Sequence, residues 1–146
     1  MAFTVTETLD LEAPLALAFE TLADHAGWFD WMPAGFVPVG PPLGQLHAGL
    51  GLRVRIAGAP FASRLRVSAF EAPTLITWGG GLGHALRGDH SFRFEATATG
   101  TRVTSSEIWS GWLAPLLRPG VAPVASRIGR AQLEGLRRGT LARLAR

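Results

Sequence analysis

The chain of 146 residues contains no cysteine, no tyrosine and no lysine, so all 14 of its basic residues are arginine. Without lysine it has neither a Schiff-base amine nor the lysine of a phosphate-binding loop. Without cysteine it has no thiolate nucleophile and no cysteine-ligated metal site. Without tyrosine it has no phenolic general acid. Acid–base chemistry is therefore left to histidine, aspartate and glutamate, with arginine, serine and threonine as the remaining polar groups.

Charged residues are also scarce, at 17% of the chain, and the formal net charge is only +3. The isoelectric point of about 11.2 reflects the lack of groups that titrate between histidine and arginine. Residues 1–52 hold six acidic side chains and no arginine, whereas residues 53–146 hold five acidic side chains and all 14 arginines. This asymmetry favours a basic surface on the second part. The arginines are not interleaved with aromatic residues in a recognisable module, so nucleic acid is not a predicted partner.

Long hydrophobic runs are absent as well, since no apolar stretch approaches the ~20 residues of a membrane-spanning helix. No basic segment precedes a hydrophobic one near Met1, so no signal peptide is predicted and the cytoplasm is the expected location. With 47% hydrophobic residues, the chain predicts one domain over residues 1–146 with a single core. Membrane contact is expected to be transient at most. The four histidines lack metal-ligand spacing, so neither a metal nor another cofactor is predicted. The oligomeric state does not follow from the sequence.

The stretch from Asp89 to Trp109 alternates on both sides of Thr99-Gly100, which is typical of a β-hairpin with a tight turn. A two-residue loop there pairs Phe92 with Glu107 across the strands. A longer loop changes the partners but keeps the alternation of each strand, so the faces are predicted independently of the turn. One face is mostly apolar but includes a histidine, a serine and a carboxylate: His90, Phe92, Phe94, Ala96, Val103, Ser105, Glu107 and Trp109.

Glu107 is the most informative residue on this face, because a carboxylate among apolar side chains must be paired, hydrated or raised in pKa. Three interpretations remain open. His90 and Glu107 satisfy each other or the backbone inside an ordinary core, or the face lines a wet or ligand-filled cavity, or a different register exposes Glu107.

The segment before residue 50 predicts one strand and two short helices. Residues 2–11 alternate and are rich in β-branched side chains, which is typical of a strand. Pro14 and the apolar spacing after it predict a helix, and Asp24 is a candidate N-cap for a second helix through Phe29. The prolines and glycines of residues 33–49 predict a loop with at most a short edge strand.

Three further strands are predicted at residues 49–56, 61–70 and 74–78. The second is expected to point Leu65, Val67 and Ala69 inward. In the first two strands arginines alternate with apolar residues, which predicts an exposed basic ladder of Arg53, Arg55, Arg64 and Arg66. The glycine-rich segment of residues 78–83 lacks the lysine and hydroxyl of a phosphate loop and is interpreted as a mobile connection.

The segment after Trp112 is helical in composition, but Pro115, Pro119 and Pro123 interrupt its first part, so the main helix is predicted to begin near residues 121–124. A solvated stripe is predicted on one side, with Arg130–Glu134 and Glu134–Arg138 pairs at i,i+4 spacing. The stripe comprises Arg127, Arg130, Glu134, Arg137 and Arg138. The inward arc is predicted to comprise Val124, Ile128, Ala131, Gly135, Gly139 and Ala142. Its small residues fit either close packing on the sheet or room for a ligand.

Residues 88–94 (GDHSFRF) and 100–111 (GTRVTSSEIWSG) resemble the H-x-F-x-F and G-T-R-x-x-x-x-E-x-F/W-x-G pattern of bacterial members of the START-like superfamily, also called SRPBCC. The order of elements extends this resemblance over essentially the whole chain. It implies an α+β helix-grip fold, in which a curved antiparallel sheet wraps around a long C-terminal helix. Two short helices follow the first strand, and an internal cavity holds an apolar ligand. Where many members carry a second histidine before the glutamate, this chain has Ser105.

The same resemblance implies that Trp28, Trp31 and Met32 lie near the cavity mouth, and it sets the hairpin face opposite the small-residue arc of the last helix. A ligand is therefore expected in a gap beside Ala131, Gly135 and Gly139. The candidate ligand-binding residues are Trp28, Trp31, Trp78, His90, Phe92, Phe94, Ser105, Glu107, Trp109, Ala131, Gly135 and Gly139.

The superfamily transports lipids, binds hormones and small aromatics, cyclises or dehydrates polyketides and assists chaperones, so the resemblance implies a ligand class rather than one function. The favoured hypothesis is a carrier or sensor that binds a small hydrophobic or amphipathic molecule, such as a lipid or a polyketide-like compound. One alternative is a cyclase, aromatase or dehydratase with Glu107 and His90 as the catalytic candidates. Another is a chaperone-associated or other partner-binding module that uses the arginine-rich surface.

Overall fold

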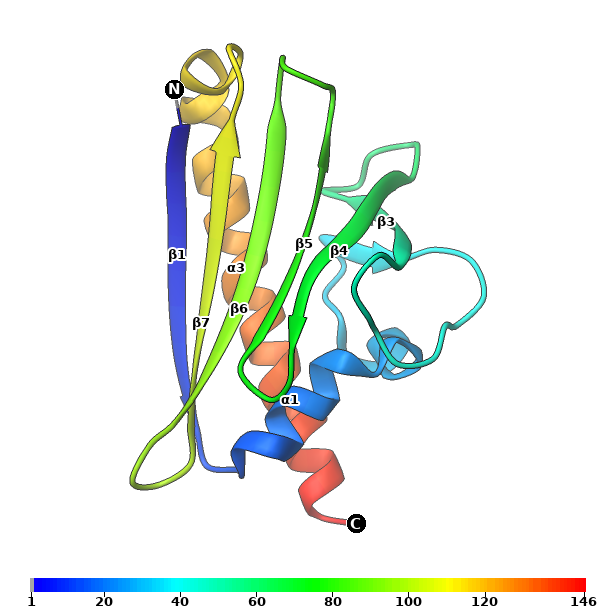
Figure 1. Cartoon of the computed structure of the whole chain (residues 1–146), viewed down its shortest axis with the longest axis vertical. Helices are drawn as coiled ribbons and strands as arrows, with labels where there is room; N and C mark the ends of the chain where they lie inside the picture. Colours follow the sequence, from blue (N-terminus) through cyan, green and yellow to red (C-terminus); the bar gives the residue numbers. More distant parts are fainter. Residues whose placement is uncertain (1) are drawn as a thin grey trace.

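One antiparallel sheet and a long C-terminal helix make up most of the structure, a computed structural model that describes residues 2–146 (Figure 1). In chain order the elements are β1 (Ala2–Leu11), α1 (Leu15–Ala23), the 3-10 helix η1 (His25–Gly27), α2 (Trp28–Trp31), β2 (Phe36–Pro38), β3 (Gly51–Ile56), β4 (Ser63–Glu71), β5 (Leu75–Gly81), β6 (Arg87–Ala96), β7 (Thr101–Ser110) and α3 (Ala114–Leu144). The predicted α+β helix-grip fold is confirmed.

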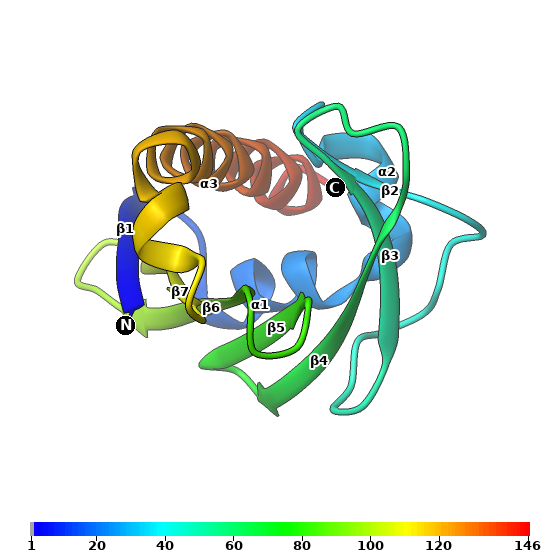
Figure 2. The ribbon, with the colours of Figure 1, turned by 90° about the horizontal axis from the view of Figure 1, so that it is seen from above.

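The sheet has seven strands in the order β1-β7-β6-β5-β4-β3-β2, and every neighbouring pair is antiparallel. From β7 to β2 the strands follow the reverse order of the chain, and only β1 lies out of sequence, beside β7. The sheet curves so that α3 lies across its concave side (Figure 2). The predicted short edge strand is β2, which pairs only with β3.

The β6–β7 hairpin has the predicted faces but not the predicted register. Its loop is four residues long, Thr97–Gly100, and is closed by the Thr97 side chain, whose hydroxyl accepts a hydrogen bond from the Gly100 N–H at 3.0 Å. His90 therefore lies opposite Glu107, and Phe92 lies opposite Ser105. The partners move by two residues, which leaves every side chain on its predicted face because the strand period is two.

Trp78 to Gly81 belong to β5, so the interpretation of this part of the glycine-rich segment as a mobile connection is wrong, whereas Leu82 and Gly83 lie in the β5–β6 loop. Gly79, Gly80 and Gly81 pair with Asp89, Gly88 and Arg87 across β5 and β6. The neighbouring strands approach too closely for side chains here, since a Cβ on Gly80 would lie 2.6 Å from the Arg64 carbonyl oxygen. The glycines are thus explained by close backbone approach.

The predicted inward-facing residues of β4 are wrong after Val67, because a β-bulge between Val67 and Ala69 shifts the alternation of the strand. After the bulge Phe70, rather than Ala69, packs against the core, where its ring contacts Phe19 at a centroid distance of 5.3 Å. The predicted basic ladder is exposed, with Arg53 directly opposite Arg64.

The short helices follow β1 as predicted, but Asp24 is not their cap. No side chain caps η1, and the Asp24 carboxylate instead accepts a hydrogen bond from Arg143 near the end of α3. This ion pair joins the region between α1 and η1 to the last turn of the C-terminal helix.

Helix α3 begins at Ala114, earlier than predicted, because its prolines do not interrupt it. Pro115 lies in the first turn, where its missing N–H is not required. Pro119 and Pro123 lie inside the helix on its exposed side, where water can hydrogen-bond the backbone carbonyls that have lost an N–H partner. The tertiary contacts therefore outweigh the local cost of the prolines.

The stripe of charged residues on α3 lies toward solvent, but its ion pairs differ from the prediction. Neither predicted i,i+4 pair is found in residues 2–146. Glu134 pairs with Arg137 at 3.6 Å, and Arg130 reaches across to Glu7 of β1 at 3.6 Å.

The buried side of α3 is also rotated from the predicted arc. The residues buried beyond the first turn are Ala125, Gly129, Gln132, Leu133, Gly135, Leu136 and Thr140. Val124, Ile128, Ala131 and Gly139 are only partly buried, and Ala142 is exposed. Gly135 is thus the one member of the predicted arc that is buried.

Aromatic side chains fill the centre of the fold between the sheet and the short helices. Trp78 contacts Trp28 at a centroid distance of 5.1 Å, Phe36 at 5.9 Å and Phe92 at 5.1 Å. Leu133 and Leu136 of α3 belong to the same core. No helix among the described residues is long and apolar enough to cross a membrane.

Candidate functional site

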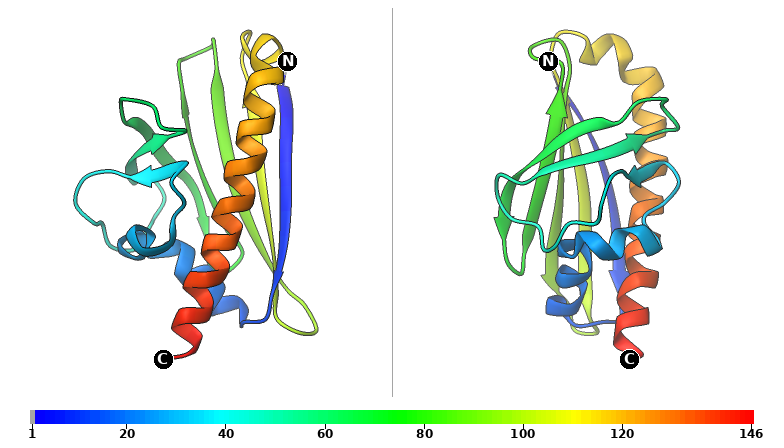
Figure 3. Two further views of the ribbon diagram at one scale, coloured as in Figure 1. Left: turned by 180° about the vertical axis from the view of Figure 1, so that it is seen from behind. Right: turned by 90° about the vertical axis from the view of Figure 1, so that its right-hand side faces the viewer.

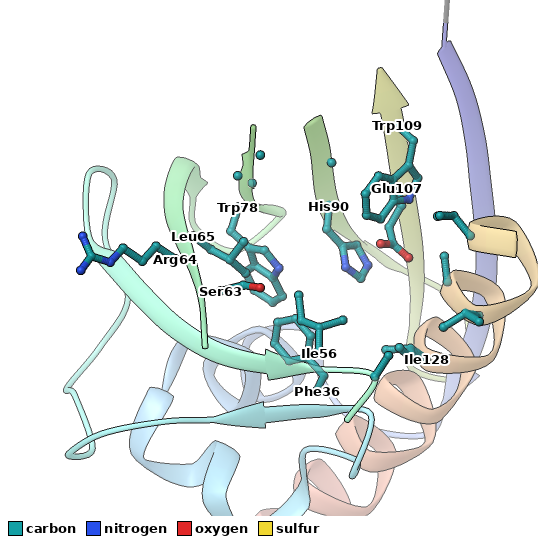
Figure 4. A pocket seen from close by; sticks show the side chains of 18 of the residues that line it. Phe36, Ile56, Ser63, Arg64, Leu65, Trp78, His90, Glu107, Trp109 and Ile128 are labelled. Carbon is teal, nitrogen blue, oxygen red and sulfur yellow. The ribbon is translucent and has the colours of Figure 1, made fainter. Parts of the chain in front are cut away.

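A cavity of about 650 Å³ lies between the upper part of the sheet and the N-terminal half of α3 (Figure 4). Its size is within the range of pockets that bind small molecules. Its wall is formed by Phe36, Ile56, Ala57, Phe61, Ala62, Ser63, Arg64, Leu65, Trp78, Gly79, Gly80, Gly81, Leu82, Gly88, His90, Glu107, Trp109, Gly120, Val121, Val124, Ala125, Ile128 and Gln132.

Four glycines contribute backbone to the cavity wall on the sheet side. Gly79, Gly80 and Gly81 place bare backbone in the wall contributed by β5. Gly88 does the same on β6, where the Trp109 ring lies against it: a Cβ on Gly88 would be 3.1 Å from two atoms of that ring. The absence of side chains on this part of the sheet leaves room that the opposite wall, on α3, does not fill.

His90 forms part of the polar end of the cavity and is held neutral. Its Nε2 and the Ser105 Oγ are 2.6 Å apart, and its ring stacks on Phe92 at a centroid distance of 4.2 Å. Burial lowers the pKa of His90 to about 3. A neutral imidazole hydrogen-bonded to a hydroxyl is a fixed polar group at physiological pH rather than a cation.

Glu107 lies directly opposite His90 across the hairpin but does not pair with it. Among residues 2–146 its carboxyl group has neither a hydrogen bond nor a salt bridge, and burial raises its pKa to about 7. The first of the three interpretations, mutual satisfaction of His90 and Glu107, is therefore wrong. At neutral pH the acid and the carboxylate are present in comparable amounts, so this group can donate or accept a proton.

Gln132 and Trp109 add polar atoms without partners to the same wall. Gln132 is 1% exposed, and neither its Oε1 nor its Nε2 has a hydrogen-bond partner; the Trp109 Nε1 is likewise buried and unpaired. Buried polar groups are normally satisfied, but neighbouring protein atoms cover these three, so a guest molecule would reach them only after the side chains move. Gln132 was missed from the sequence.

The structure brings four of the sequence candidates together in the cavity wall: Trp78, His90, Glu107 and Trp109. Other candidates lie behind the wall. Trp28, Phe92 and Phe94 belong to the buried core, and Ser105 is buried behind the His90 ring, to which it is hydrogen-bonded.

The predicted gap beside Ala131, Gly135 and Gly139 is not present. Trp31 occupies this region: a Cβ on Gly135 would lie 2.3 Å from the Trp31 carbonyl oxygen, and one on Gly139 would lie 2.7 Å from the Trp31 Cδ1. These glycines therefore allow α2 to pack closely on α3. Ala131 lines a separate pocket of about 450 Å³ beside Pro33. The cavity lies against residues 120–132 of α3, closer to its N-terminus than predicted.

Several wall residues were not predicted as site residues. Phe61 lies before β4, which begins at Ser63 rather than at residue 61 as predicted, and Leu82 lies in the β5–β6 loop, where a single apolar residue carries no periodic signal. Among residues 2–146 no group of three or more histidine, aspartate or glutamate side chains is placed to hold a metal ion.

Comparison with solved structures shows the same fold in bacterial proteins of low sequence identity. MLL2253 from Mesorhizobium loti has a TM-score of 0.70 at 18% identity, over 97% of this chain and 98% of that protein. The Helicobacter pylori protein jhp0584 has a TM-score of 0.71 at 19% identity, over 92% and 85% of the two chains. DynU16, from the dynemicin biosynthetic locus, has a TM-score of 0.69 at 15% identity, over 92% of this chain and 46% of that protein. No curated protein matches the sequence significantly.

Comparison with protein families gives a match over residues 2–146, to the family described as "Polyketide cyclase / dehydrase and lipid transport". The match spans every element that forms the sheet, the helix α3 and the cavity. It agrees with the START-like resemblance of the hairpin segments. The chain belongs to the polyketide cyclase/dehydrase and lipid transport family.

Proposed function

We propose that this protein binds a small amphipathic molecule, with a hydrophobic body and a polar end, in the cavity between the sheet and α3. The observation that carries the proposal is the cavity of about 650 Å³, whose mostly apolar wall includes the unpaired carboxyl group of Glu107. A ligand with a polar end would give this carboxyl group a hydrogen-bond partner that the protein does not supply.

The wall supports a ligand of mixed character. Phe36, Ile56, Val121, Val124 and Ile128 offer apolar contacts, which suit a ring system or an acyl chain. The polar side chains of the wall lie on several elements: His90 on β6, Glu107 on β7, Gln132 on α3, and Ser63 and Arg64 on β4. The Glu107 carboxyl group, which can donate or accept a hydrogen bond, is the partner that we propose for the polar end of the ligand. Carbonyl and hydroxyl groups match this carboxyl group.

Native mass spectrometry of gently purified protein, followed by extraction and identification of retained small molecules, tests the proposal directly. Titration with N-phenyl-1-naphthylamine, a neutral apolar dye, tests whether the cavity accepts a guest. Val121→Phe should reduce dye affinity because the added ring fills the cavity. Ala142→Phe, which adds the same ring at an exposed position on the same helix, is the matched control. Absence of both a retained ligand and dye uptake by the wild-type protein would refute the proposal.

A second candidate is an enzyme that uses Glu107 as a general acid–base. The observation that favours it is the position of this unpaired carboxyl group in the cavity wall, with a pKa raised to about 7 by burial. Such a pKa suits proton transfer at neutral pH. His90 would orient the substrate as a neutral hydrogen-bonding group, since its pKa of about 3 keeps it uncharged.

The test of this candidate is turnover of any carbonyl compound that the protein is found to bind. Glu107→Gln keeps the size of the side chain and should abolish proton transfer while retaining binding. Turnover that survives in Glu107→Gln would exclude the role of Glu107, and the protein would then act as a carrier or sensor.

A further inference from the structure

The most exposed large apolar side chains among residues 2–146 lie in the cavity wall or in the segment that joins β7 to α3. They are Leu82, Leu116, Trp112 and Phe61, at 73, 71, 66 and 65% exposure. Leu82 and Phe61 also line the cavity. We call these four residues the rim. Exposed apolar side chains are common singly, but a cluster around an opening indicates an interaction surface.

The rim residues come from three segments that are far apart in sequence. Leu82 belongs to the β5–β6 loop, Trp112 and Leu116 to the junction between β7 and α3, and Phe61 to the β3–β4 loop. The β5–β6 loop and the β7–α3 junction lie at the same end of the molecule (Figure 3).

Backbone hydrogen bonds hold the first two of these segments together. The Trp112 N–H donates to the His84 carbonyl at 3.3 Å, and the Leu113 N–H donates to the Ala85 carbonyl at 2.9 Å. Gly111, at φ 103°, allows the close contact, since a Cβ there would lie 2.4 Å from the Ala85 oxygen. Trp112 is thus exposed on a fixed backbone, which favours a preformed contact surface over a loop that folds back on itself.

The basic charge near the rim comes from two exposed arginines, Arg118 and Arg64. Arg87 is paired with Asp89 at 2.9 Å, whereas Arg118 is exposed and lies over the Phe3 ring at 5.6 Å. Arg64 of the basic ladder is exposed on the opposite side of the mouth. Apolar side chains flanked by arginine are typical of proteins that insert into the headgroup region of an anionic bilayer.

We propose that the rim docks reversibly on an anionic lipid bilayer, with Trp112, Leu116, Leu82 and Phe61 inserted at the interface and the cavity mouth facing the acyl chains. A bilayer fits better than a protein partner because the centre of the rim is the open cavity, whereas protein interfaces are tightly packed at their centre. A bilayer is fluid, so its lipids can pack around the cavity mouth. The proposed docking depends on the exposed apolar side chains and on the charge of the nearby arginines. It therefore does not depend on the proposed ligand.

Flotation with vesicles of phosphatidylcholine alone or with about one third phosphatidylglycerol tests the proposal. The protein should float with the anionic vesicles, and added salt should weaken the association. The double variant Trp112→Ala/Leu116→Ala should bind about tenfold or more weakly, because it removes two inserted apolar side chains. The matched control is Leu141→Ala/Leu144→Ala, which removes two exposed leucines at the other end of α3 and should float as the wild type does.

Several outcomes would overturn the proposal. Absence of flotation with anionic vesicles would exclude docking, and equal loss in the two double variants would show that the rim has no special role. If sedimentation analysis shows a wild-type dimer and Trp112→Ala/Leu116→Ala is a monomer, the rim would instead be the interface with a second copy of the chain. Dye uptake in the absence of vesicles should be unchanged in this variant, so failure to dock and failure to bind a ligand are separate results.

Discussion

Replacing Glu107 by glutamine tests the electrostatic state of the cavity wall, because the amide keeps the size of the side chain but cannot ionise. Burial raises the pKa of Glu107 from 4.5 to about 7. Between these pH values the folded protein keeps a proton that the unfolded chain releases. The free energy of unfolding therefore falls as pH rises through this window, and the penalty is complete above pH 7.

The size of the penalty follows from the same pKa. The interval from 4.5 to about 7, at about 1.4 kcal/mol for each pH unit, corresponds to ~3 kcal/mol. This is an upper value, because part of the carboxyl group faces the open cavity and water there screens its charge. Glu107→Gln should match the wild type below pH 4.5 and exceed its free energy of unfolding by up to ~3 kcal/mol at pH 8, a melting temperature roughly 6–12 °C higher.

His90 titrates with the opposite sign and sets the shape of the wild-type curve. Burial lowers its pKa from 6.5 to about 3, so its contribution is present above pH 6.5 and is lost as pH falls toward 3. In the wild type the two groups oppose each other between pH 4.5 and 6.5. In Glu107→Gln the rise due to His90 should remain in that window, together with a rise from His25, whose pKa is also lowered by burial.

Urea unfolding of the two proteins at several values between about pH 4 and pH 8 measures the difference curve, from which the other titrating groups cancel. A difference that stays constant with pH would show that Glu107 titrates as an exposed carboxyl group does. A variant less stable than the wild type at pH 8 would show that the ionised carboxylate has a stabilising partner. Either result would refute the burial of an unpaired carboxyl group in the wall.

Two further predictions concern packing. Gly135→Ala should destabilise the protein by ~2 kcal/mol or more in chemical unfolding, because its Cβ meets the Trp31 backbone oxygen, whereas Gly129→Ala should be neutral or stabilising by ~0.5–1 kcal/mol, since the nearest atoms there are 3.6 Å away. Equal effects at the two glycines would contradict this assignment. Ser105→Ala should cost ~1–3 kcal/mol by leaving the buried His90 Nε2 without its partner, and a stability equal to the wild type would show that another group replaces the hydroxyl.

The faces of the central hairpin could be predicted from the sequence, but its register could not. The faces depend only on the period of two, which His90, Phe92 and Phe94 share with Val103 and Ser105. The register depends on how the turn closes. The strong β-turn signal at Thr99-Gly100 suggested two residues, whereas the hydrogen bond from the Gly100 N–H to the Thr97 side chain makes a four-residue loop.

The position of the cavity could not be predicted for a different reason. Small residues on a helix face permit either a gap or a close contact, and the sequence does not say which large side chain approaches. Trp31 fills the space beside Gly135 and Gly139, so the gap lies closer to the N-terminus of α3. The glycine-rich segment was likewise ambiguous, because only the neighbouring strands make the absence of side chains necessary. Gln132 lies between apolar residues and gave no separate signal.

One part of the cavity wall, the glycine backbone of β5, cannot accept larger side chains, whereas another part, on α3, can. Any side chain on Gly80 or Gly81 would collide with a carbonyl oxygen of a neighbouring segment, 2.6 or 2.2 Å from its Cβ. On the helix side, by contrast, a Cβ on Gly120 would meet nothing within 4 Å, and Val121 and Val124 are free to change in size. Redesign of ligand selectivity should therefore alter α3 and leave the sheet unchanged, and natural variants with other ligands should differ first along this helix.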